Sequence, residues 1–223
     1  MPGSRTTAAL ERSVHRYRSA PLVARWFVHG RAFLSDLAFV ERFVPRHGFI
    51  VDLGSGHGLF ANVLAEAGPG RRVLGIDIDE RKIDIARATI GGREGLRFEV
   101  GDIIHELPPR CDAITIVDVL YLLTAADQEA VLRKAAQALA PNAPLVVKAQ
   151  ERAASTRYAL TYGQELLTVG LGFTRQSARR FHFPSRSEAL AMFGRAGFLV
   201  DVVEMPRRPY SDVLYLARKA PAP

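Results

Sequence analysis

Residues 51–60 read VDLGSGHGLF and place an acid, Asp52, just ahead of three glycines spaced at every second position. The run Phe49 to Leu53 is mostly apolar and predicts a strand, while 59–67 carries apolar residues at helical spacing. A strand that turns through glycine directly into a helix aims backbone N–H groups and the positive helix end at the space above the sheet. The stretch therefore predicts the ligand-binding turn of an open α/β sheet.

Outward from this turn, short apolar runs alternate with amphipathic helical patterns, as expected for a parallel sheet covered by helices. Most of the runs are continuously apolar, which predicts strands buried on both faces and a three-layered fold. Further strands are predicted at 72–77, 96–100, 113–117, 144–148, 199–204 and 213–217, and helices at about 83–90, 127–139 and 187–195.

Two segments lie outside this alternation. Residues 1–46 are predicted to form an N-terminal helical segment on the substrate side, with one or two helices over 19–44 interrupted at Gly30. Residues 151–182 are predicted to be a cap inserted in the main domain, 47–223, over the carboxyl ends of the strands, where open α/β sheets bind ligands. The N-terminal helices are marked by Leu22, Trp26, Phe33, Leu37, Val40 and Val44.

Length and composition indicate a globular protein with one main domain. The chain has 223 residues, of which 48% are hydrophobic, and no apolar run reaches the roughly 20 residues that span a bilayer. The first ten residues lack a secretory signal pattern, so a cytoplasmic location is expected. The single cysteine, Cys111, is expected to be a buried, inert thiol. Arginines accompany the aromatic residues of 19–44 and leave a peripheral membrane contact open.

The net charge of +7 is unevenly distributed along the chain. Residues 1–46 carry +5, 47–150 carry −3 and 151–223 carry +5. Basic regions can bind nucleic acid, so a nucleic-acid partner stays open. Arginine outnumbers lysine 26 to 4, however, which points to biased composition, and a solvated basic surface is favoured over a polyanion site.

The spacing of the glycines argues against a dinucleotide. Gly54 suits the tight turn, Gly56 lets a ligand approach the main chain, and Gly58 allows close packing of the helix. A dinucleotide loop would want its third glycine at residue 59, which is leucine. Asp52 would repel a pyrophosphate but can pair with a cationic group. A nicotinamide oxidoreductase is therefore disfavoured.

The stretch DLGSGHG resembles the first motif of the class I S-adenosylmethionine-dependent methyltransferases. The resemblance implies an α/β fold with a Rossmann-like, seven-stranded, mostly parallel sheet and helices on both faces. It also implies that Asp52 orders the ammonium group of S-adenosylmethionine. The loop residues that would wrap the amino-acid part of this cofactor are Gly54, Ser55, Gly56 and Gly58.

Three further stretches resemble motifs of the same family, in the family's order. RVLGIDID places Asp77 where the ribose hydroxyls are held, in a charge-assisted bidentate arrangement, with Ile78 against the adenine. FEVGDI places Asp102 at the adenine amino group and Ile103 on the ring. CDAITIVDVLYLL places Asp118 near the sulfur. The turn at 141–143 reads Pro-Asn-Ala where relatives usually have Pro-Gly-Gly, and asparagine tolerates the left-handed backbone needed there.

The residues after the fourth strand narrow the choice of acceptor. Asp118-Val119-Leu120-Tyr121 is not the Asn/Asp-Pro-Pro-aromatic tetrapeptide of base amino-group methylation, a Pro-Cys nucleophile is absent, and no acids cluster for a metal. A small, fairly apolar or lipid-like acceptor is predicted, methylated on oxygen or nitrogen, with S-adenosylhomocysteine as co-product and no metal. Tyr121 is a catalytic candidate because a side chain that faces the cavity is expected after the fourth strand. The other candidates are His182 and Tyr158 or Tyr162, which could orient or deprotonate an acceptor hydroxyl. His57 is expected at the cofactor's edge.

Two other functions stay open. An RNA or protein methyltransferase would use the basic flanks, and a catalytically silent, cofactor-binding subunit would act through a partner protein.

Overall fold

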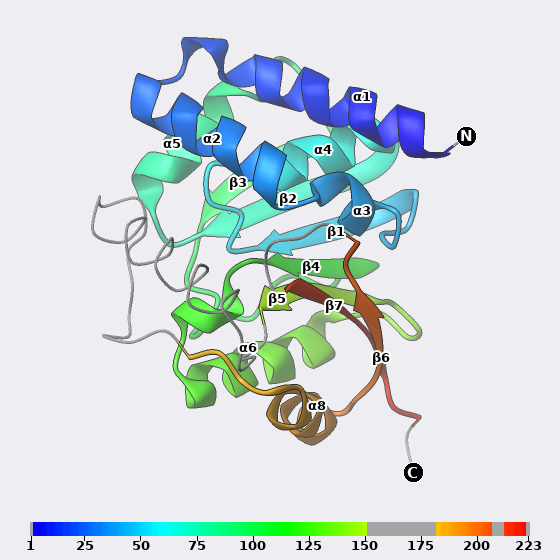
Figure 1. The fold of residues 1–223 in the computed structure, drawn as a ribbon. Helices are drawn as coiled ribbons and strands as arrows, with labels where there is room; N and C mark the ends of the chain where they lie inside the picture. The colour runs from blue at the N-terminus through cyan, green and yellow to red at the C-terminus, as the bar shows by residue number, and fades with distance from the viewer. Residues whose placement is uncertain (1, 151–181, 207–211, 222–223) are drawn as a thin grey trace.

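The computed structural model describes residues 2–150, 182–206 and 212–221. Within these ranges, seven strands form one sheet in the order β3-β2-β1-β4-β5-β7-β6, with β7 antiparallel to both of its neighbours and all other pairs parallel (Figure 1). The predicted α/β fold with a seven-stranded, mostly parallel sheet is confirmed. The strands are β1 (His47–Leu53), β2 (Gly70–Asp77), β3 (Leu96–Val100), β4 (Ala113–Val117), β5 (Leu145–Gln150), β6 (Phe198–Glu204) and β7 (Asp212–Lys219).

Helices cover both faces of the sheet, and each face has its own hydrophobic core. On one face α1, α2 and α4 lie above the sheet, and on the other α6 and α8 lie below it (Figure 1). The helices are α1 (Pro2–His15), α2 (Leu22–Leu34), α3 (Leu37–Glu41), α4 (Leu59–Ala67), α5 (Glu80–Ala88), α6 (Ala125–Ala138) and α8 (Arg186–Arg195), with 3₁₀ turns η1 (Arg16–Ser19) and η2 (Leu120–Leu122).

The two strands at the centre of the sheet are the most apolar. Every residue of β4 and β5 is buried, whereas β3 at the edge is buried only at Leu96 and Phe98. The prediction of double-sided burial therefore holds for the central strands. Asn142 adopts a left-handed φ of 60° in the turn before β5, as its residue type predicts.

The N-terminal segment is helical, but in a different way from the prediction. Helix α2 runs through Gly30, and the break falls instead at Asp36, which has a φ of 40°. A glycine lowers helix propensity by about 1 kcal/mol, and this is too little to end a helix that packs on its neighbours. Helix α1 has no strong apolar stripe, because Thr6, Ala9 and Ser13 form much of its buried face.

The residues buried from α2 also differ from those expected. Ala24 and Val28 are buried, while Trp26 is 79% exposed and Leu22 and Phe33 project outward as well. The later residues of the pattern, Leu37, Val40 and Val44, are buried as predicted. None of the helices in the described ranges combines the length and apolarity needed to cross a lipid bilayer.

Candidate active site

A cavity of about 510 Å³ lies beside the carboxyl ends of the parallel strands, and α2 forms one of its walls. Gly58 and His182 are absent from the described lining, and Tyr158 lies outside the described residues. The candidates that do line the cavity are Asp52, Gly54, Ser55, Gly56, Asp77, Ile78, Asp102, Ile103, Asp118 and Tyr121.

The glycine loop has its own hydrogen bonds. The N–H groups of Gly54 and Ser55 donate to the carbonyl of Ile76 at 2.8 and 2.9 Å, and that of Gly56 donates to Asp77 at 2.8 Å. The sequence of the turn predicted that these N–H groups would point at a ligand. In the structure they donate to Ile76 and Asp77 instead. A Cβ at Gly58 would lie 2.6 Å from the Phe98 ring, so this glycine allows α4 to pack closely.

Asp52 is the most unusual acid in the cavity wall. It is 1% exposed, and one carboxylate oxygen accepts a hydrogen bond from Thr115 at 2.6 Å. The other oxygen, Oδ2, is buried without a hydrogen-bond partner in the described structure. Burial raises the pKa of Asp52 to about 7, against the lowering effect of the Thr115 hydrogen bond. A ligand's ammonium group would supply the missing donor and the missing charge.

Asp77 is held rigidly at the end of β2. Its Oδ2 accepts from the N–H of Gly56, and its Oδ1 accepts from the N–H of Asp79 at 3.0 Å. A carboxylate oxygen has two lone pairs, so each oxygen can still accept a ligand hydroxyl. The N-cap of α5 is Asp79, whose side chain accepts from the N–H of Arg81. Asp77 therefore does not serve as that helix's cap.

The adenine side predicted from the sequence combines apolar and acidic groups. Ile78 is 53% exposed at the cavity, and Ile103 packs partly on the core. Asp102 accepts hydrogen bonds from the N–H of Ile104 at 2.8 Å and pairs with His105 at 2.9 Å. Burial raises the pKa of Asp102, but these hydrogen bonds outweigh it and hold the pKa below its ordinary value. Asp102 is therefore ionised at neutral pH.

Two further side chains with reactive atoms are both uncharged at pH 7. Burial, with Lys82 and Arg31 nearby, lowers the pKa of His57 to about 4, so its ring is neutral. That ring packs 5.1 Å from the ring of Phe27 at the cavity wall. Cys111 is buried, as predicted, and burial raises the pKa of its thiol to about 12.

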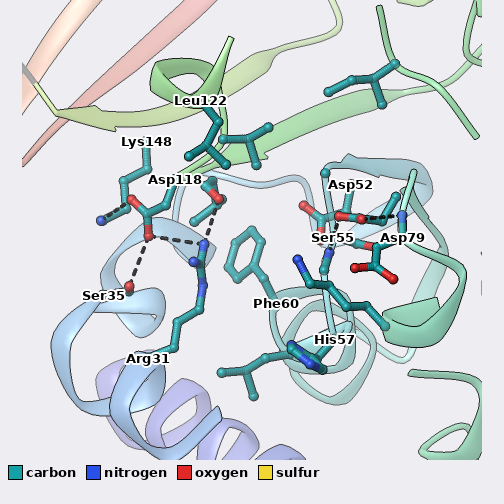
Figure 2. A pocket seen from close by; sticks show the side chains of 18 of the residues that line it. Arg31, Ser35, Asp52, Ser55, His57, Phe60, Asp79, Asp118, Leu122 and Lys148 are labelled. Carbon is teal, nitrogen blue, oxygen red and sulfur yellow. Dashed lines mark hydrogen bonds and ion pairs between the residues drawn. The ribbon is translucent and has the colours of Figure 1, made fainter. Parts of the chain in front are cut away.

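A second polar group lies on the other side of the cavity and is centred on Asp118. Lys148 Nζ lies 2.5 Å from Asp118 Oδ1, while Ser35 and Arg31 contact Oδ2 at 3.0 and 3.2 Å. Figure 2 shows these four side chains facing one another, with Phe60 between them and the loop that carries Ser55 and His57. Asp118 has a left-handed φ of 57°, which these contacts hold in place. The structure thus engages Asp118 with protein cations.

The same group extends to the antiparallel end of the sheet. Lys148 Nζ also lies 2.8 Å from Asp212 Oδ2. Burial lowers the pKa of Lys148, but the two carboxylates outweigh it and hold the pKa above its ordinary value. Sequence reasoning missed Arg31, Lys148 and Asp212 as a group. One signal was present: Lys148 is a lone charge inside the apolar strand LVVKAQ, and a buried charge needs a partner.

Of the catalytic candidates with described positions, Tyr121 is buried at the cavity and its ring stacks on Phe183 with centroids 5.0 Å apart. His182 lies beside it, but the hydrogen bonds of His182 are made by its backbone: its N–H donates to Tyr121 and its carbonyl accepts from Gln128. The structure therefore brings Tyr121, and not His182, to the cavity wall.

The cavity is acidic although the chain is basic. Its described lining holds six aspartates against Arg31, Lys82 and Lys148, a formal net charge of −3, in a chain of net +7. A cationic ligand is therefore favoured over an anionic one. Among the described residues, no three His, Cys, Asp or Glu side chains are grouped as they would be around a metal ion.

The fold and the acid-tipped strands define a class I, Rossmann-like methyltransferase fold. In agreement, residues 50–142 match the family described as methyltransferase domain. Residues 50–142 are therefore similar to a methyltransferase domain, and the seven-stranded sheet agrees with this similarity.

Individual relatives are similar over part of the chain. Trans-aconitate 2-methyltransferase of Sinorhizobium fredii is 27% identical over 135 residues, which are 60% of this chain and 51% of that protein. An uncharacterised RNA methyltransferase of Streptomyces avermitilis is 36% identical over 100 residues, 44% of this chain and 23% of that protein. The chain thus spans about half the length of the first relative and less of the second.

A solved structure shares the fold over most of the chain. The mitomycin 7-O-methyltransferase MmcR superposes with a TM-score of 0.68 at 20% sequence identity, over 97% of this chain and 68% of that one.

Proposed function

We propose that this protein transfers a methyl group from S-adenosylmethionine to an oxygen, or a nitrogen, of a small and fairly apolar acceptor. The observation that carries the proposal is Asp52: a buried carboxylate oxygen without a partner, at the wall of an acidic cavity. Leaving such a group unpaired costs about 1–3 kcal/mol or more, so a cationic ligand group is the natural partner.

The chain's own residues divide the work of holding the cofactor. Asp52 would pair with the ammonium group, and Asp77 would accept the ribose hydroxyls with oxygens already oriented by Gly56 and Asp79. Asp102 would accept from the adenine amino group between Ile78 and Ile103. When bound, S-adenosylmethionine supplies a methyl group made electrophilic by a sulfonium. The protein then has to align the acceptor and exclude water.

The acceptor would enter the part of the cavity below α2. Its wall there is largely apolar, which suits a small apolar molecule better than a phosphate chain. Tyr121, buried at this wall, is the described residue proposed to orient the acceptor, while roles for His182 and Tyr158 remain predictions. The apolar residues are Phe27, Leu34, Phe60, Val119, Leu122 and Leu123.

An RNA substrate is the second candidate, because the flanks are basic and one relative is named as an RNA methyltransferase. The net charge of −3 at the cavity opposes it, since phosphates would meet like charge. RNA binding that weakens steeply with salt, together with methylation of RNA alone, would favour this candidate.

Calorimetry with S-adenosylmethionine and S-adenosylhomocysteine tests the cofactor assignment. Asp77→Ala should weaken the affinity for S-adenosylhomocysteine by about 1.5–3 kcal/mol, the loss expected for hydrogen bonds to a charged group. The exposed Asp84→Ala on α5 is the matched control and should leave the affinity unchanged. Absence of binding heat in the wild type, or an unchanged affinity in Asp77→Ala, would contradict the assignment.

Incubation with methyl-labelled cofactor and fractionated cell extract tests the acceptor class. Label in the small-molecule fraction is expected, and label confined to RNA or protein would overturn this part of the proposal. Cofactor binding without any transfer, in a chain that copurifies with a second protein, would support the silent-subunit alternative.

A further inference from the structure

The antiparallel end of the cavity carries two polar side chains that are not needed to hold the cofactor. Gln150 ends β5 and Asp212 begins β7, and the two are direct partners in the ladder between these strands. Direct partners across an antiparallel pair project from the same face, so both side chains point to the α2 side of the sheet. They are 6% and 8% exposed and both line the cavity.

Each of these side chains has one oxygen atom that accepts no hydrogen bond. Asp212 Oδ2 is held by Lys148 at 2.8 Å, but Asp212 Oδ1 and Gln150 Oε1 are buried without a hydrogen-bond partner in the described structure. Buried acceptors are rarely left unsatisfied, because each forgoes the hydrogen bonds it makes in water. Two such oxygens side by side at a cavity wall indicate that a ligand supplies the donor.

The surrounding charges define what kind of donor fits. Arg31 and Lys148 are balanced by Asp118 and Asp212, so the formal local charge is zero. A ligand cation would gain no net attraction and would meet the Lys148 ammonium. A ligand anion would meet the two unpaired oxygens. A neutral hydroxyl donates to one or both oxygens without either conflict.

The sheet order places this pair away from Asp52, the residue predicted to pair with the ammonium group of the cofactor. Asp52 is on β1, and β4 and β5 separate β1 from β7. Neighbouring strands are about 4.8 Å apart, so the backbone of Asp212 lies about 14 Å from β1 across the sheet. Lys148 Nζ lies 2.8 Å from Asp212 Oδ2 and 2.5 Å from Asp118 Oδ1, so a group bound at this pair lies on the Asp118 side of the cavity.

We propose that Gln150 and Asp212 form a subsite that binds a neutral hydroxyl group of the acceptor, on the side of the cavity away from Asp52. The inference rests on the proposed function, because it assigns one end of the same cavity to the acceptor. Both residues are specificity determinants here, and no proton transfer is assigned to them.

The test compares two probes of similar size, phenol and toluene, on protein saturated with S-adenosylhomocysteine, by ligand-observed NMR titration. Toluene is the more readily desolvated, so an apolar cavity alone would favour it. The wild type is expected to prefer phenol by about five- to tenfold, the worth of one hydrogen bond to a charged or polar acceptor. Benzoate and benzylamine, an anion and a cation of similar size, should bind more weakly than phenol.

Two variants locate the preference. Gln150→Leu leaves every charge in place, and Asp212→Leu leaves Lys148 paired with Asp118. Each should lose the preference for phenol, because the apolar side chain removes one acceptor oxygen. Asp201→Leu on the exposed side of β6 is the matched control and should keep it. Calorimetry with S-adenosylhomocysteine checks that each variant is folded.

Three results would overturn the subsite. These are equal or weaker binding of phenol than of toluene to the wild type, a phenol preference that survives in both leucine variants, and tighter binding of benzylamine than of phenol. Any of them, with normal S-adenosylhomocysteine binding, removes the subsite and leaves the methyltransferase proposal standing. Failure of the wild type to bind S-adenosylhomocysteine would remove both.

Discussion

The two sides of the cavity differ in whether a buried aspartate is paired with cations of the protein. On the β1–β3 side, Asp52 is buried with an unpaired oxygen, and burial raises its pKa to about 7. On the β4–β7 side, Asp118 is also buried, but Lys148 and Arg31 outweigh the effect of burial and hold its pKa below the ordinary value. One carboxylate lacks a counterion and the other has two.

The difference indicates which side a charged ligand occupies. A buried acid that has protein counterions needs no charge from a ligand, whereas a buried acid without them is stabilised by a cationic ligand. The Asp118 group ties α2 to the sheet through Arg31 and Ser35, so it shapes the cavity. The Asp52 side is the one prepared for a cation. Substitutions on the two sides should therefore have opposite effects on stability.

Lys148→Met should have the largest effect. It removes the cation between Asp118 and Asp212 and leaves buried carboxylates without their main partner, so the free energy of unfolding should fall by about 3–5 kcal/mol. Urea denaturation followed by circular dichroism measures this. The same change on a helix surface, Lys134→Met, should cost less than about 1 kcal/mol.

A double variant tells lost pairing from lost packing. Lys148→Met combined with Asp212→Leu removes one uncompensated acid and should recover part of the stability lost in Lys148→Met. If the double variant is less stable than the single one, or if Lys148→Met unfolds like the wild type, the charge-balanced description of this side is wrong.

Much of the fold could be predicted from the sequence, because its signals are local. The periodicity of apolar residues placed β3 and β4 at the bounds the structure has, and most other strands and helices within a few residues. The exception was α1, whose buried face uses Thr6 and Ser13 in place of an apolar stripe. Thr6 instead donates a hydrogen bond to the buried Glu41. Such polar burial depends on a distant partner that a local pattern does not reveal.

The two sides of the cavity also differ in whether local sequence patterns or contacts between distant residues define them. Apart from Asp118, the groups predicted for the cofactor lie within residues 52–103, each beside a strand end, so short motifs identify them. The other side brings together four residues that are far apart in the sequence: Arg31 of α2, Asp118 directly after β4, Lys148 of β5 and Asp212 of β7. Their meeting depends on the order of strands in the sheet, and β7 enters it out of sequence, between β5 and β6.

The glycine loop provides a comparison within the cofactor side. Gly58 has a φ of 79°, and an added Cβ would lie 2.6 Å from Phe98, so Gly58→Ala should destabilise by about 2–4 kcal/mol through strain and overpacking. Gly56 has a φ of 55° but nothing within 4 Å of an added Cβ. Gly56→Ala should therefore cost only about 1–2 kcal/mol of backbone strain.

Gly56→Ala, the variant that loses less stability, should lose more affinity for the cofactor than Gly58→Ala. Because Gly56 lines the cavity and Gly58 does not, calorimetry should show the greater loss of S-adenosylhomocysteine affinity in Gly56→Ala. Equal stabilities, measured by urea denaturation, or a greater affinity loss in Gly58→Ala would contradict the separate packing and binding roles of these glycines.

Asp52→Asn should stabilise the ligand-free protein, the opposite of Lys148→Met. The folded-state pKa of Asp52 is raised from 3.8 to about 7, so the wild type loses stability as pH rises between these two values and has lost it fully above about 7. The shift corresponds to about 4 kcal/mol. Part is offset because the asparagine N–H would lack an acceptor, and that costs about 1–3 kcal/mol. The net gain at pH 8 should therefore be about 2 kcal/mol.

The pH dependence of that gain identifies its cause. In urea denaturation, the advantage of Asp52→Asn over the wild type should shrink as pH falls from 8 toward 4, because the wild-type carboxyl then becomes neutral as well. An exposed change, Asp201→Asn, should give no such trend. Affinity for S-adenosylhomocysteine should fall by about tenfold or more in Asp52→Asn at pH 8, because the charge that pairs with an ammonium group is gone. A variant that is stabilised but binds as tightly as the wild type would mean that the unpaired oxygen of Asp52 serves no ligand.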